Sequence, residues 1–461
     1  MPQIENQPSH KERGRGQKEK KMISKLTAST IYSTLGNNSS LIPLGIKDVA
    51  NSCGLTAASY IAGDKVEGKD RFIDEFGTQA IWLGGIPAYK YILDKTIFRH
   101  SKLDPQVDVR LFKDKKILTL AKQFAPSEEI KQSIVNASKN QKLFKSLTMA
   151  KFVASTALTA LSYFGLTKFR HKYTENQIKK DYFENRKHIA ESFGSREIPF
   201  SSKFSAVHKD KKNSQVSFTG GLQDFMFNPV KNLMIVDGVI TGERLSHSRN
   251  PQDFMGYVIK EGSFWAFMYF AGPLISKALE KHSEKFHNKS IDLDARVIEN
   301  EDFKNAFKDG SIKEHLKDFT ENKNISDSYL YKFAVNPENN ENLIVKMAKE
   351  SDIIPRLEIA PFKKHPTIVD TRKYINLDDL KEIGSKVEKL LHQYEKSGED
   401  IDTFFKSVRK LKRASVIKNI GACIGALGVL APAIMLAVRY FGDNKDYQVK
   451  KDVEAKLEQQ A

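Results

Sequence analysis

Cysteine is nearly absent from this chain of 461 residues, which holds only Cys53 and Cys423. Two isolated cysteines exclude a disulfide framework and a cysteine-rich zinc site, and they fit a reducing compartment. The His-Glu-x-x-His, Cys-x-x-Cys, Gly-x-Ser-x-Gly and Gly-x-Gly-x-x-Gly motifs are missing as well. We therefore predict that the protein is not an enzyme and has no catalytic residue, no metal site and no cofactor.

Acidic residues are also comparatively few. The chain has 57 Asp and Glu against 74 Lys and Arg, which gives a formal net charge of +17 and favours an anionic partner. Basic residues are dense over positions 11–25, and no apolar stretch follows them, so this segment is not a secretory signal. We predict a disordered basic arm over residues 1–44, which is either a solvated tail or a segment that lies along acidic lipid or nucleic acid. The partner expected for the chain is a lipid bilayer with anionic head groups. Nucleic acid is not the expected partner, because no segment alternates basic and aromatic residues.

Long apolar runs are scarce, since 40% of the residues are hydrophobic and the mean hydropathy is −0.46. The exception is residues 419–438, NIGACIGALGVLAPAIMLAV, which contain no acidic or basic side chain. As a helix this run would be about 30 Å long, the thickness of the hydrocarbon core of a bilayer. Lys418 and Arg439 flank it, and Tyr440 and Phe441 follow, as is typical of a span that leaves lipid. We predict a membrane helix here; the alternative is a buried helix of a soluble bundle.

Small residues in this run are spaced so that several of them share one side of a helix. Such a side allows close contact with a neighbouring helix. The predicted helix-packing face consists of Gly421, Ala422, Gly425, Ala426 and Gly428.

Five shorter apolar segments accompany the long run, at residues 49–63, 73–93, 152–167, 232–242 and 258–279, and a polar link at 64–71 separates the first two. Residues 152–167 lie between two lysines whose side chains can extend a span of about 24 Å, so we predict a second membrane helix there. Segments 73–93 and 258–279 contain the two tryptophans, Trp82 and Trp265. These segments fit either interfacial or re-entrant pieces or core helices. We expect a multi-pass membrane protein.

The second half of the chain resembles the first half. Residues 186 positions apart coincide at Ile73/Ile259, Glu75/Glu261, Pro87/Pro273, Asp108/Asp294 and Arg110/Arg296. Further on, FKS recurs at 144–146 and 405–407, and QIKKD at 177–181 matches QVKKD at 448–452. The matches keep one order along the chain, which favours a tandem duplication over coincidence. We expect two copies that fold alike and whose long apolar helices are neighbours.

Three carboxylates are candidate functional residues. Glu75 and Glu261 occupy matching positions at the beginning of the aromatic segments, and Asp237 lies inside an apolar run. Ionisable side chains at membrane depth are unfavourable and usually functional. The alternative is that each is a solvated acid at the beginning of a helix, where it complements the helix dipole.

These observations predict a mainly α, membrane-associated helical protein made of two diverged tandem copies, with a small soluble α+β insertion in the second copy. The predicted parts are the arm (1–44), the first copy (45–182), a polar linker (183–222), the first part of the second copy (223–297), the insertion (298–404) and the final part of the second copy (405–456). Within the insertion, Asn376 and the apolar residues from Leu377 to Leu390 predict a capped amphipathic helix.

The function predicted from the sequence is that of a non-enzymatic membrane-anchored scaffold or interaction protein, with a possible protein partner bound through residues 298–404. One alternative is a small transporter or channel with inverted repeats, because three crossing segments per copy would put the copies in opposite orientations. The other alternative is a soluble basic protein that binds nucleic acid.

Overall fold

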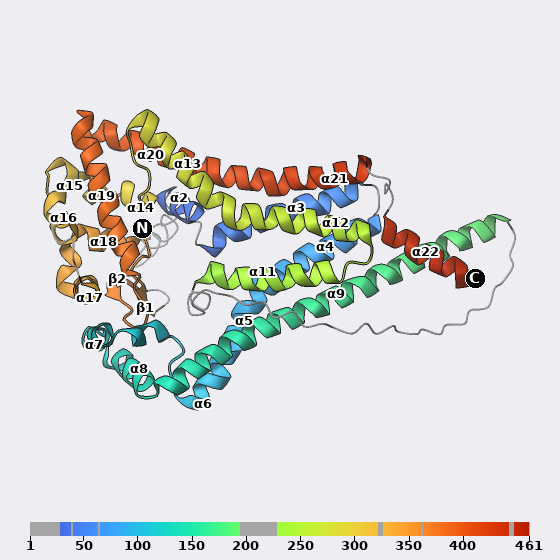
Figure 1. Cartoon of the computed structure of the whole chain (residues 1–461), viewed down its shortest axis with the longest axis horizontal. Coiled ribbons are helices and arrows are strands. Elements are labelled where there is room, and N and C mark those ends of the chain that lie inside the picture. Colours follow the sequence, from blue (N-terminus) through green and yellow to red (C-terminus); the bar gives the residue numbers. More distant parts are fainter. Residues whose placement is uncertain are drawn as a thin grey trace, which may run out of the picture. The chain divides into compact units, whose positions relative to one another are not determined.

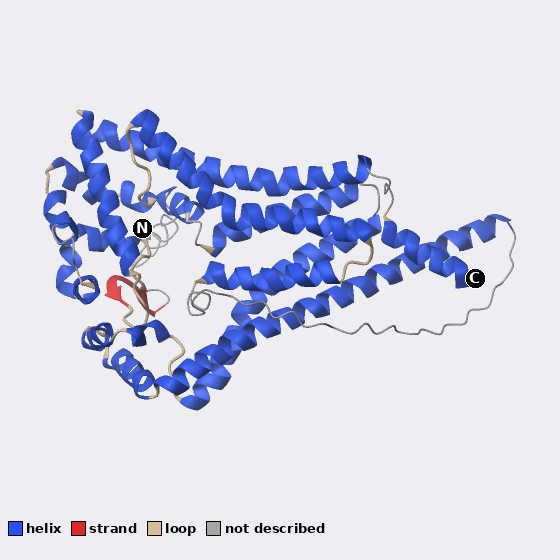
Figure 2. Ribbon diagram, viewed as in Figure 1, coloured by secondary structure: helices blue, strands red, loops and turns tan. Residues whose placement is uncertain are grey.

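The computed structural model of the chain describes residues 28–37, 40–62, 65–193, 228–320, 326–360, 363–441 and 447–460, and these residues are mainly helical, as predicted (Figure 2). The basic residues 11–25 and the larger part of the predicted polar linker lie outside the described residues. The chain divides into two compact units. Residues 39–113, 132–274 and 421–461 form what we call the bundle unit, and the remaining residues form the mixed unit.

Six long helical segments of the described residues build the bundle unit (Figure 1). The first four are α3 (Leu41–Ile61); α4 (Lys65–Ala80), continued by η1 (Ile81–Gly85) and α5 (Ile86–Leu93); α9 (Gln141–Phe193); and α11 (Pro229–Ser246). The fifth is α12 (Pro251–Trp265), continued by η4 (Ala266–Phe270) and α13 (Ala271–His287), and the sixth is α20 (Ile401–Gly425), continued by η6 (Ala426–Leu430) and α21 (Ala431–Phe441). Residues 275–287 of α13 and 401–420 of α20 belong to the mixed unit. The shorter η2 (Asp94–Phe98), α6 (Arg99–Ser101), η3 (Val109–Lys113) and α22 (Gln448–Gln460) also belong to this unit.

The local sequence determines where several of these helices begin. The side chains of Ser40, Asn228 and Asn250 accept hydrogen bonds from backbone N–H groups of the first turns of α3, α11 and α12. Proline follows each of the two asparagines, at a position where its missing N–H is not needed. The polar link predicted at 64–71 is wrong, because α4 begins at Lys65 and runs through it.

Three of the long segments contain a π-helical turn within their apolar part: η1, η4 and η6. Such a turn inserts an extra residue into the helical ladder and is often found at functional sites. Pro87 is the second residue of α5, which continues η1, and its missing N–H group leaves one hydrogen bond of the helix unmade. The apolar segments at 73–93 and 258–279 are therefore continuous helices with a π turn, rather than re-entrant loops.

Helices α9 and α11 run in the same direction, although they are consecutive in the bundle unit (Figure 1). The beginning of α11 packs near Ile86, and the nearby Tyr89 contacts Ser162 of α9. Further along both helices, Arg170 of α9 and Arg244 of α11 each reach Asp74 of α4.

Each long apolar helix packs against both halves of the sequence. Helix α9 contacts α4 and α5 of its own half and α11 of the other half. Segment η6–α21 likewise contacts α12 of its own half and α3 of the other half. The prediction that the two long apolar helices are neighbours is wrong, because α3, α4, α11 and α12 supply the main packing partners of α9 and α21 among the described residues.

Two helices are long and apolar enough to cross a membrane: residues 141–187 of α9, and the continuous helix of α20, η6 and α21 from Ile401 to Phe441. Both contain a span predicted from the sequence, at 152–167 and 419–438. Only 22% of the apolar stretch of each helix is buried inside the protein. Length and composition thus agree with the two predicted spans and give weak support to a membrane location.

The closest helix contact that involves the predicted packing face is between α3 and η6. A Cβ atom on Gly54 would lie 2.2 Å from the carbonyl oxygen of Gly428, and one on Gly428 would lie 3.1 Å from the carbonyl oxygen of Ala50. Ala426 is buried, but Gly421, Ala422 and Gly425 are exposed. Of the predicted face, residues 426 and 428 therefore lie on the packed side of the helix, and residues 421, 422 and 425 do not.

We predict that Gly54→Ala destabilises the bundle unit, whereas Gly421→Ala does not. The alanine at 54 meets backbone atoms that cannot rotate away, so α3 and η6 must separate, at a cost of about 1–3 kcal/mol. At position 421 nothing lies within 4 Å, and alanine is a better helix former than glycine by about 0.8–1 kcal/mol. Unfolding titrations of the two variants check this, and equal midpoints would contradict the contact.

The mixed unit contains α2 (Ala28–Gly36), α7 (Lys115–Gln123), α14 (Ala295–Ile298), α15 (Glu301–Lys308), α16 (Ile312–Thr320), α17 (Asp327–Val335), η5 (Pro337–Glu341), α18 (Leu343–Glu350), α19 (Leu377–Ser397) and the strands β1 (Arg356–Ala360) and β2 (Lys363–Val369). The strands pair in antiparallel register with irregularities on both sides of Glu358. Asn376 caps α19, and the apolar side of this helix is buried from Leu377 to Leu391, as the spacing predicts. Helix α2 lies within the arm predicted at 1–44, so that boundary is wrong for residues 28–36.

Candidate functional site: an ionic network inside the bundle

The interior of the bundle unit is lined by charged side chains. Helix α4 contributes most of them, because Asp70, Asp74 and Thr78 follow one another at intervals of four residues and share one side of the helix. Glu75 lies next to this row, and all four side chains are buried. A buried charge is tolerated only when it is paired and hydrogen-bonded. The partners come from α9, α11 and α12.

Helices α9 and α12 present complementary rows to α4. On α9, Tyr163, Thr167, Arg170 and Thr174 recur at intervals of three and four residues and are buried. On α12, Asp253, Tyr257, Lys260, Glu261 and Phe264 do the same. Polar residues at a helical period thus replace the apolar stripe that a helix of a soluble bundle turns inward.

Arg244 of α11 joins four helices. Its guanidinium group lies 2.5 Å from Glu261 Oε1 and 3.3 Å from Asp74 Oδ1, and it donates a hydrogen bond of 3.0 Å to Thr78 Oγ1. Its Nε donates to the hydroxyl of Tyr163 on α9. These contacts use the planar donor set of arginine, which suits several acceptors at once.

Lys260 of α12 is the second central cation and is only 2% exposed. Its Nζ atom lies 2.7 Å from Glu75 Oε1, and 3.7 Å from both Asp74 Oδ2 and Glu261 Oε1. Two acids of α4 and one of α12 therefore surround one ammonium group. Removal of that group would leave buried negative charge without compensation.

The network continues to one end of the bundle through Arg170 and Arg249. Arg170 lies 2.9 Å from Asp74 Oδ2, and Arg249 lies 2.8 Å from Asp70 Oδ2 and 3.1 Å from Asp253 Oδ2. Burial acts to raise the pKa of Asp70, but the guanidinium groups of Arg170 and Arg249 outweigh it and hold this pKa below its usual range. The same competition between burial and Arg249 lowers the pKa of Asp253. Both acids are ionised at neutral pH.

Asp48 and Asp237 are the buried acids at the other end of the network. Asp48 of α3 accepts a hydrogen bond of 2.8 Å from the indole N–H of Trp82, and Asp237 of α11 accepts one from the hydroxyl of Tyr269. Both acids line a cavity of about 20 Å³. Its other lining residues are Glu75, Thr78, Trp82, Ile240, Arg244, Lys260, Glu261 and Phe264.

Helix α3 has a buried polar side that leads away from this cavity. Asn51, Thr56 and Ser59 are less than 9% exposed, and the side-chain amide or hydroxyl group of each has no hydrogen-bond partner among the described residues. Buried polar groups usually have such a partner, so a row of three without one requires an explanation.

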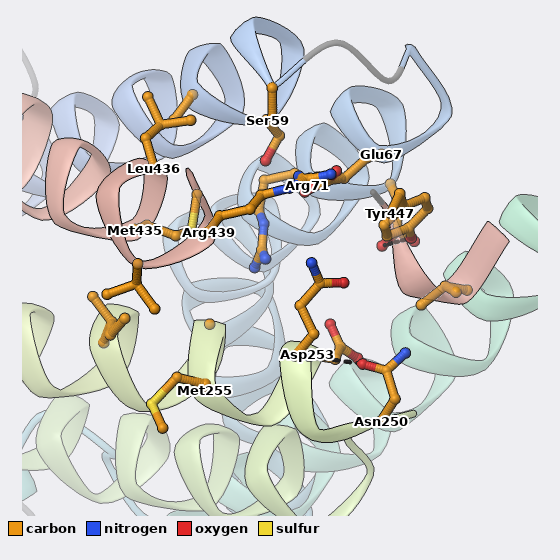
Figure 3. A pocket seen from close by; sticks show the side chains of 18 of the residues that line it. Ser59, Glu67, Arg71, Asn250, Asp253, Met255, Met435, Leu436, Arg439 and Tyr447 are labelled. Atoms are coloured by element: carbon orange, nitrogen blue, oxygen red, sulfur yellow. Dashed lines mark hydrogen bonds and ion pairs between the residues drawn. The ribbon is translucent and has the colours of Figure 1, made fainter. Parts of the chain in front are cut away.

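Ser59 lies at the wall of a larger cavity of about 300 Å³ (Figure 3). Glu67, Arg71, Asp253, Arg439 and Tyr447 give the wall a polar part. Met255, Ile259, Met435, Leu436 and Val438 give it an apolar part. The Arg439 guanidinium pairs with Glu67, and Figure 3 shows the Ser59 side chain directed toward the cavity from α3.

All three carboxylates singled out from the sequence meet in the small cavity. Glu75, Asp237 and Glu261 line it together, although they lie on three different helices. The alternative that each is a solvated acid at the beginning of a helix is wrong, because all three are buried and none lies in the first turn of its helix. Whether they are functional stays a prediction.

Sequence reasoning missed Asp48, Arg170, Arg244 and Lys260. Arg170 lies in the basic stretch 168–172 that follows a predicted span, and it turns inward while Lys168 and Lys172 are exposed. The available signal was periodicity, since Tyr163, Arg170 and Thr174 share one side of α9. Among the described residues, no group of three or more His, Cys, Asp or Glu side chains is arranged to hold a metal ion.

We compared the chain with protein-family models, with curated proteins and with solved structures, and none of the three comparisons gives a match. The function therefore has to be argued from the arrangement of the residues themselves.

Proposed function

We propose that this protein is a non-enzymatic membrane-anchored scaffold or interaction protein whose bundle unit is embedded in lipid. One observation carries the proposal: the bundle has charged side chains inside and large apolar side chains outside. The exposed large apolar residues include Ile46 and Val49 on α3, Leu83 and Tyr91 on η1 and α5, Leu161 on α9, Val239 on α11, Phe270 and Leu274 on η4 and α13, and Val429, Leu430 and Ile434 on η6 and α21. Water makes this distribution unfavourable, and hydrocarbon makes it favourable.

Contacts between the helices support a common depth for these apolar stretches. Asp48 of α3 meets Trp82 of η1, and Gly54 of α3 meets Gly428 of η6. Tyr89 of α5 meets Ser162 of α9. On the other side of the unit, Asp237 of α11 meets Tyr269 of η4. The six apolar segments thus lie side by side and form what we call the apolar belt, at residues 49–63, 73–93, 152–167, 232–242, 258–279 and 419–438.

A tandem duplication agrees with several paired features. The π turns η1 and η4 begin at Ile81 and Ala266, 185 residues apart. Gln177 Nε2 donates to Asp181 at 2.9 Å, and Gln448 Nε2 donates to Asp452 at 3.0 Å. The backbone N–H of Arg110 donates to Asp108 at 2.9 Å, and that of Arg296 donates to Asp294 at 2.8 Å.

Equivalent positions of the proposed copies also face each other across the network. The Arg71 guanidinium lies 5.5 Å from the centre of the Tyr257 ring, and Lys260 Nζ lies 3.7 Å from Asp74 Oδ2. Residues 71 and 257, and residues 74 and 260, are both 186 positions apart. Helices α3 and α11 each pack on the long helix of the opposite half. We therefore propose two copies around an approximate two-fold axis that exchange their first helices.

The helix directions bear on the transporter alternative. In a protein with inverted repeats, the two copies run in opposite directions. Here α9, the last long helix of the first proposed copy, and α11, the first helix of the second, run in the same direction, and so do the two proposed copies (Figure 1). The sequence between them, residues 194–227, contains no apolar run of the length of a span and includes Arg196, Glu197, Lys203, Lys209, Asp210, Lys211, Lys212 and Asp224. We propose embedding through the apolar belt rather than six complete crossings.

The interaction half of the proposal concerns residues 298–404. Helices α15 to α19 with the β1–β2 pair support a small α+β insertion into the second copy. We propose that a protein partner binds this insertion. Crosslinking in intact cells, followed by mass spectrometry, tests it: crosslinks should concentrate on residues 298–404, and crosslinks confined to the bundle unit would contradict it.

Cys53 provides a direct test of embedding, because it is exposed on α3 within the apolar belt. We predict that a charged, membrane-impermeant maleimide does not label Cys53 in vesicles, since hydrocarbon excludes the charged reagent. A cysteine introduced at the exposed Lys381 of α19 is the reference and should be labelled when its side of the membrane is accessible. Peptide mass spectrometry separates both sites from the buried Cys423. Equal labelling of Cys53 and the reference would show that α3 faces water.

A further inference from the structure

The charges inside the bundle do not balance. Glu243 is a buried acid that lies 3.7 Å from His247, and two other acids without a lysine or arginine partner lie together. Asp70, Asp74, Glu75, Asp253 and Glu261 each have a lysine or arginine nitrogen within 3.1 Å. Asp48 and Asp237 form no ion pair with a basic side chain in the described part of the chain, although they are only 6% exposed.. Their hydrogen bonds come from Trp82 and Tyr269, which are neutral donors.

Other charges around the small cavity do not compensate these two acids. Glu75 faces it from α4, Arg244 from α11, and Lys260 and Glu261 from α12. Within this set the two cations match Glu75 and Glu261 in number and pair with them directly. Two further ionised carboxylates would be uncompensated in a medium of low dielectric constant, and such groups take up a proton instead.

We propose that Asp48 and Asp237 form a proton-binding site, and that the buried polar side of α3 connects this site with the larger cavity at Ser59. Each carboxylate binds one proton and becomes a neutral carboxylic acid, and no electron or other group is transferred. The inference does not depend on membrane embedding. A metal ion is not the ligand, since each acid already receives an N–H or O–H donor and the cavity, of about 20 Å³, has room for about one water molecule.

The connection rests on hydroxyl groups along one buried side of α3, of which those of Thr56 and Ser59 have no hydrogen-bond partner among the described residues. Asp48 and Ser59 are eleven residues apart, which corresponds to about 16 Å along the helix. Ser52, which is fully buried and accepts a hydrogen bond from Gln79, lies four residues after Asp48 on the same side of the helix. Thr56 follows after four more residues and Ser59 after three more, so neighbouring groups are about 5–6 Å apart along the helix, a gap that one or two bridging water molecules can close. The row ends at Ser59 in the wall of the 300 Å³ cavity, beside Glu67 and Tyr447 (Figure 3). It thus offers hydrogen-bonding groups along the whole distance.

Infrared spectroscopy of the full chain tests the site directly. At neutral pH we expect the carbonyl band of protonated carboxylic acids, reduced in Asp48→Asn and in Asp237→Asn and reduced by the sum of both decreases in the double variant. Asparagine keeps the shape and the acceptor oxygen, so either single variant suffices if the other does not fold. Absence of the band from the unaltered protein, an undiminished band in the double variant, or loss of the band on addition of Na⁺ at constant pH would overturn the site.

Exchange into D₂O tests the connection. The carboxylic acid band should shift to lower frequency on exchange, and Thr56→Val should slow that shift several-fold because it removes a hydroxyl group from the row. Thr159→Val is the matched control: Thr159 is a fully buried threonine of α9 whose hydroxyl bonds to the carbonyl oxygen of Ser155, away from the row. Equal exchange rates in the two variants would overturn the connection, and the band itself would still report on the site.

Discussion

Lys260→Met is expected to lower the free energy of unfolding of the bundle unit by about 3–5 kcal/mol, the usual effect of removing one partner of a buried ion pair. The substitution keeps most of the side-chain volume and removes the ammonium group that lies 2.7 Å from Glu75 and 3.7 Å from Asp74. Net stabilities of folded proteins are about 5–15 kcal/mol, so a loss of this size brings the unit close to unfolding. Arg71 is the nearest remaining cation to Glu75, at 3.8 Å.

The unfolding of this unit can be followed by its own fluorescence, because both tryptophans of the chain, Trp82 and Trp265, lie in it. Adding Glu75→Gln to Lys260→Met removes the uncompensated negative charge, so the double variant should regain part of the lost free energy of unfolding. Lys381→Met is the control, since its pair with Asp327 is exposed on both sides and is expected to contribute at most about 1 kcal/mol. Coincident unfolding curves for Lys260→Met and Lys381→Met would show that the network does not stabilise the bundle.

The apolar parts of the fold could be predicted from the sequence, because their signal is local. Residues 152–167 and 419–438 lie in the two helices that are long and apolar enough to cross a membrane. Asn376 and the apolar period behind it likewise mark the beginning and the buried side of α19. Helix propensity, capping and periodicity act within one segment, so one segment is enough to read them.

The ionic network could not be predicted, because the residues that make it favourable are distant in sequence. Residues 64–71 read as a polar link, yet Asp70 is buried against Arg170 and Arg249, which lie 100 and 179 positions further along the chain. Charged residues normally indicate a solvated surface, and only the tertiary fold brings their partners together. The predicted packing face within 419–438 is wrong at residues 421, 422 and 425 for the same reason. Which side of this helix is packed depends on its contact with α3, which cannot be read from the segment alone.

Replacing Val429 and Leu430 together with arginine is expected to release the protein from membranes. These side chains are 68% and 53% exposed on η6, within the apolar belt, so the change leaves the packed side of the helix untouched. Leu427, by contrast, is fully buried and would report on folding instead. Each arginine at the centre of a span disfavours insertion by about 2.5–3.5 kcal/mol, and two together by about 5–7 kcal/mol if the effects add. The measured quantity is the fraction of protein that stays in the membrane pellet after an alkaline carbonate wash.

The matched control places two arginines on exposed apolar positions outside the apolar belt, at Phe286 of α13 and Tyr329 of α17, which are 64% and 46% exposed. This pair adds the same charge and removes comparable apolar surface, yet it should leave the pelleted fraction unchanged. If the unaltered protein stayed in solution and only its oligomeric state changed in Val429→Arg/Leu430→Arg, a second copy rather than lipid would cover the belt. If both double variants stayed in the pellet, η6 would not be in contact with lipid, and the anchor would have to lie elsewhere in the six apolar segments.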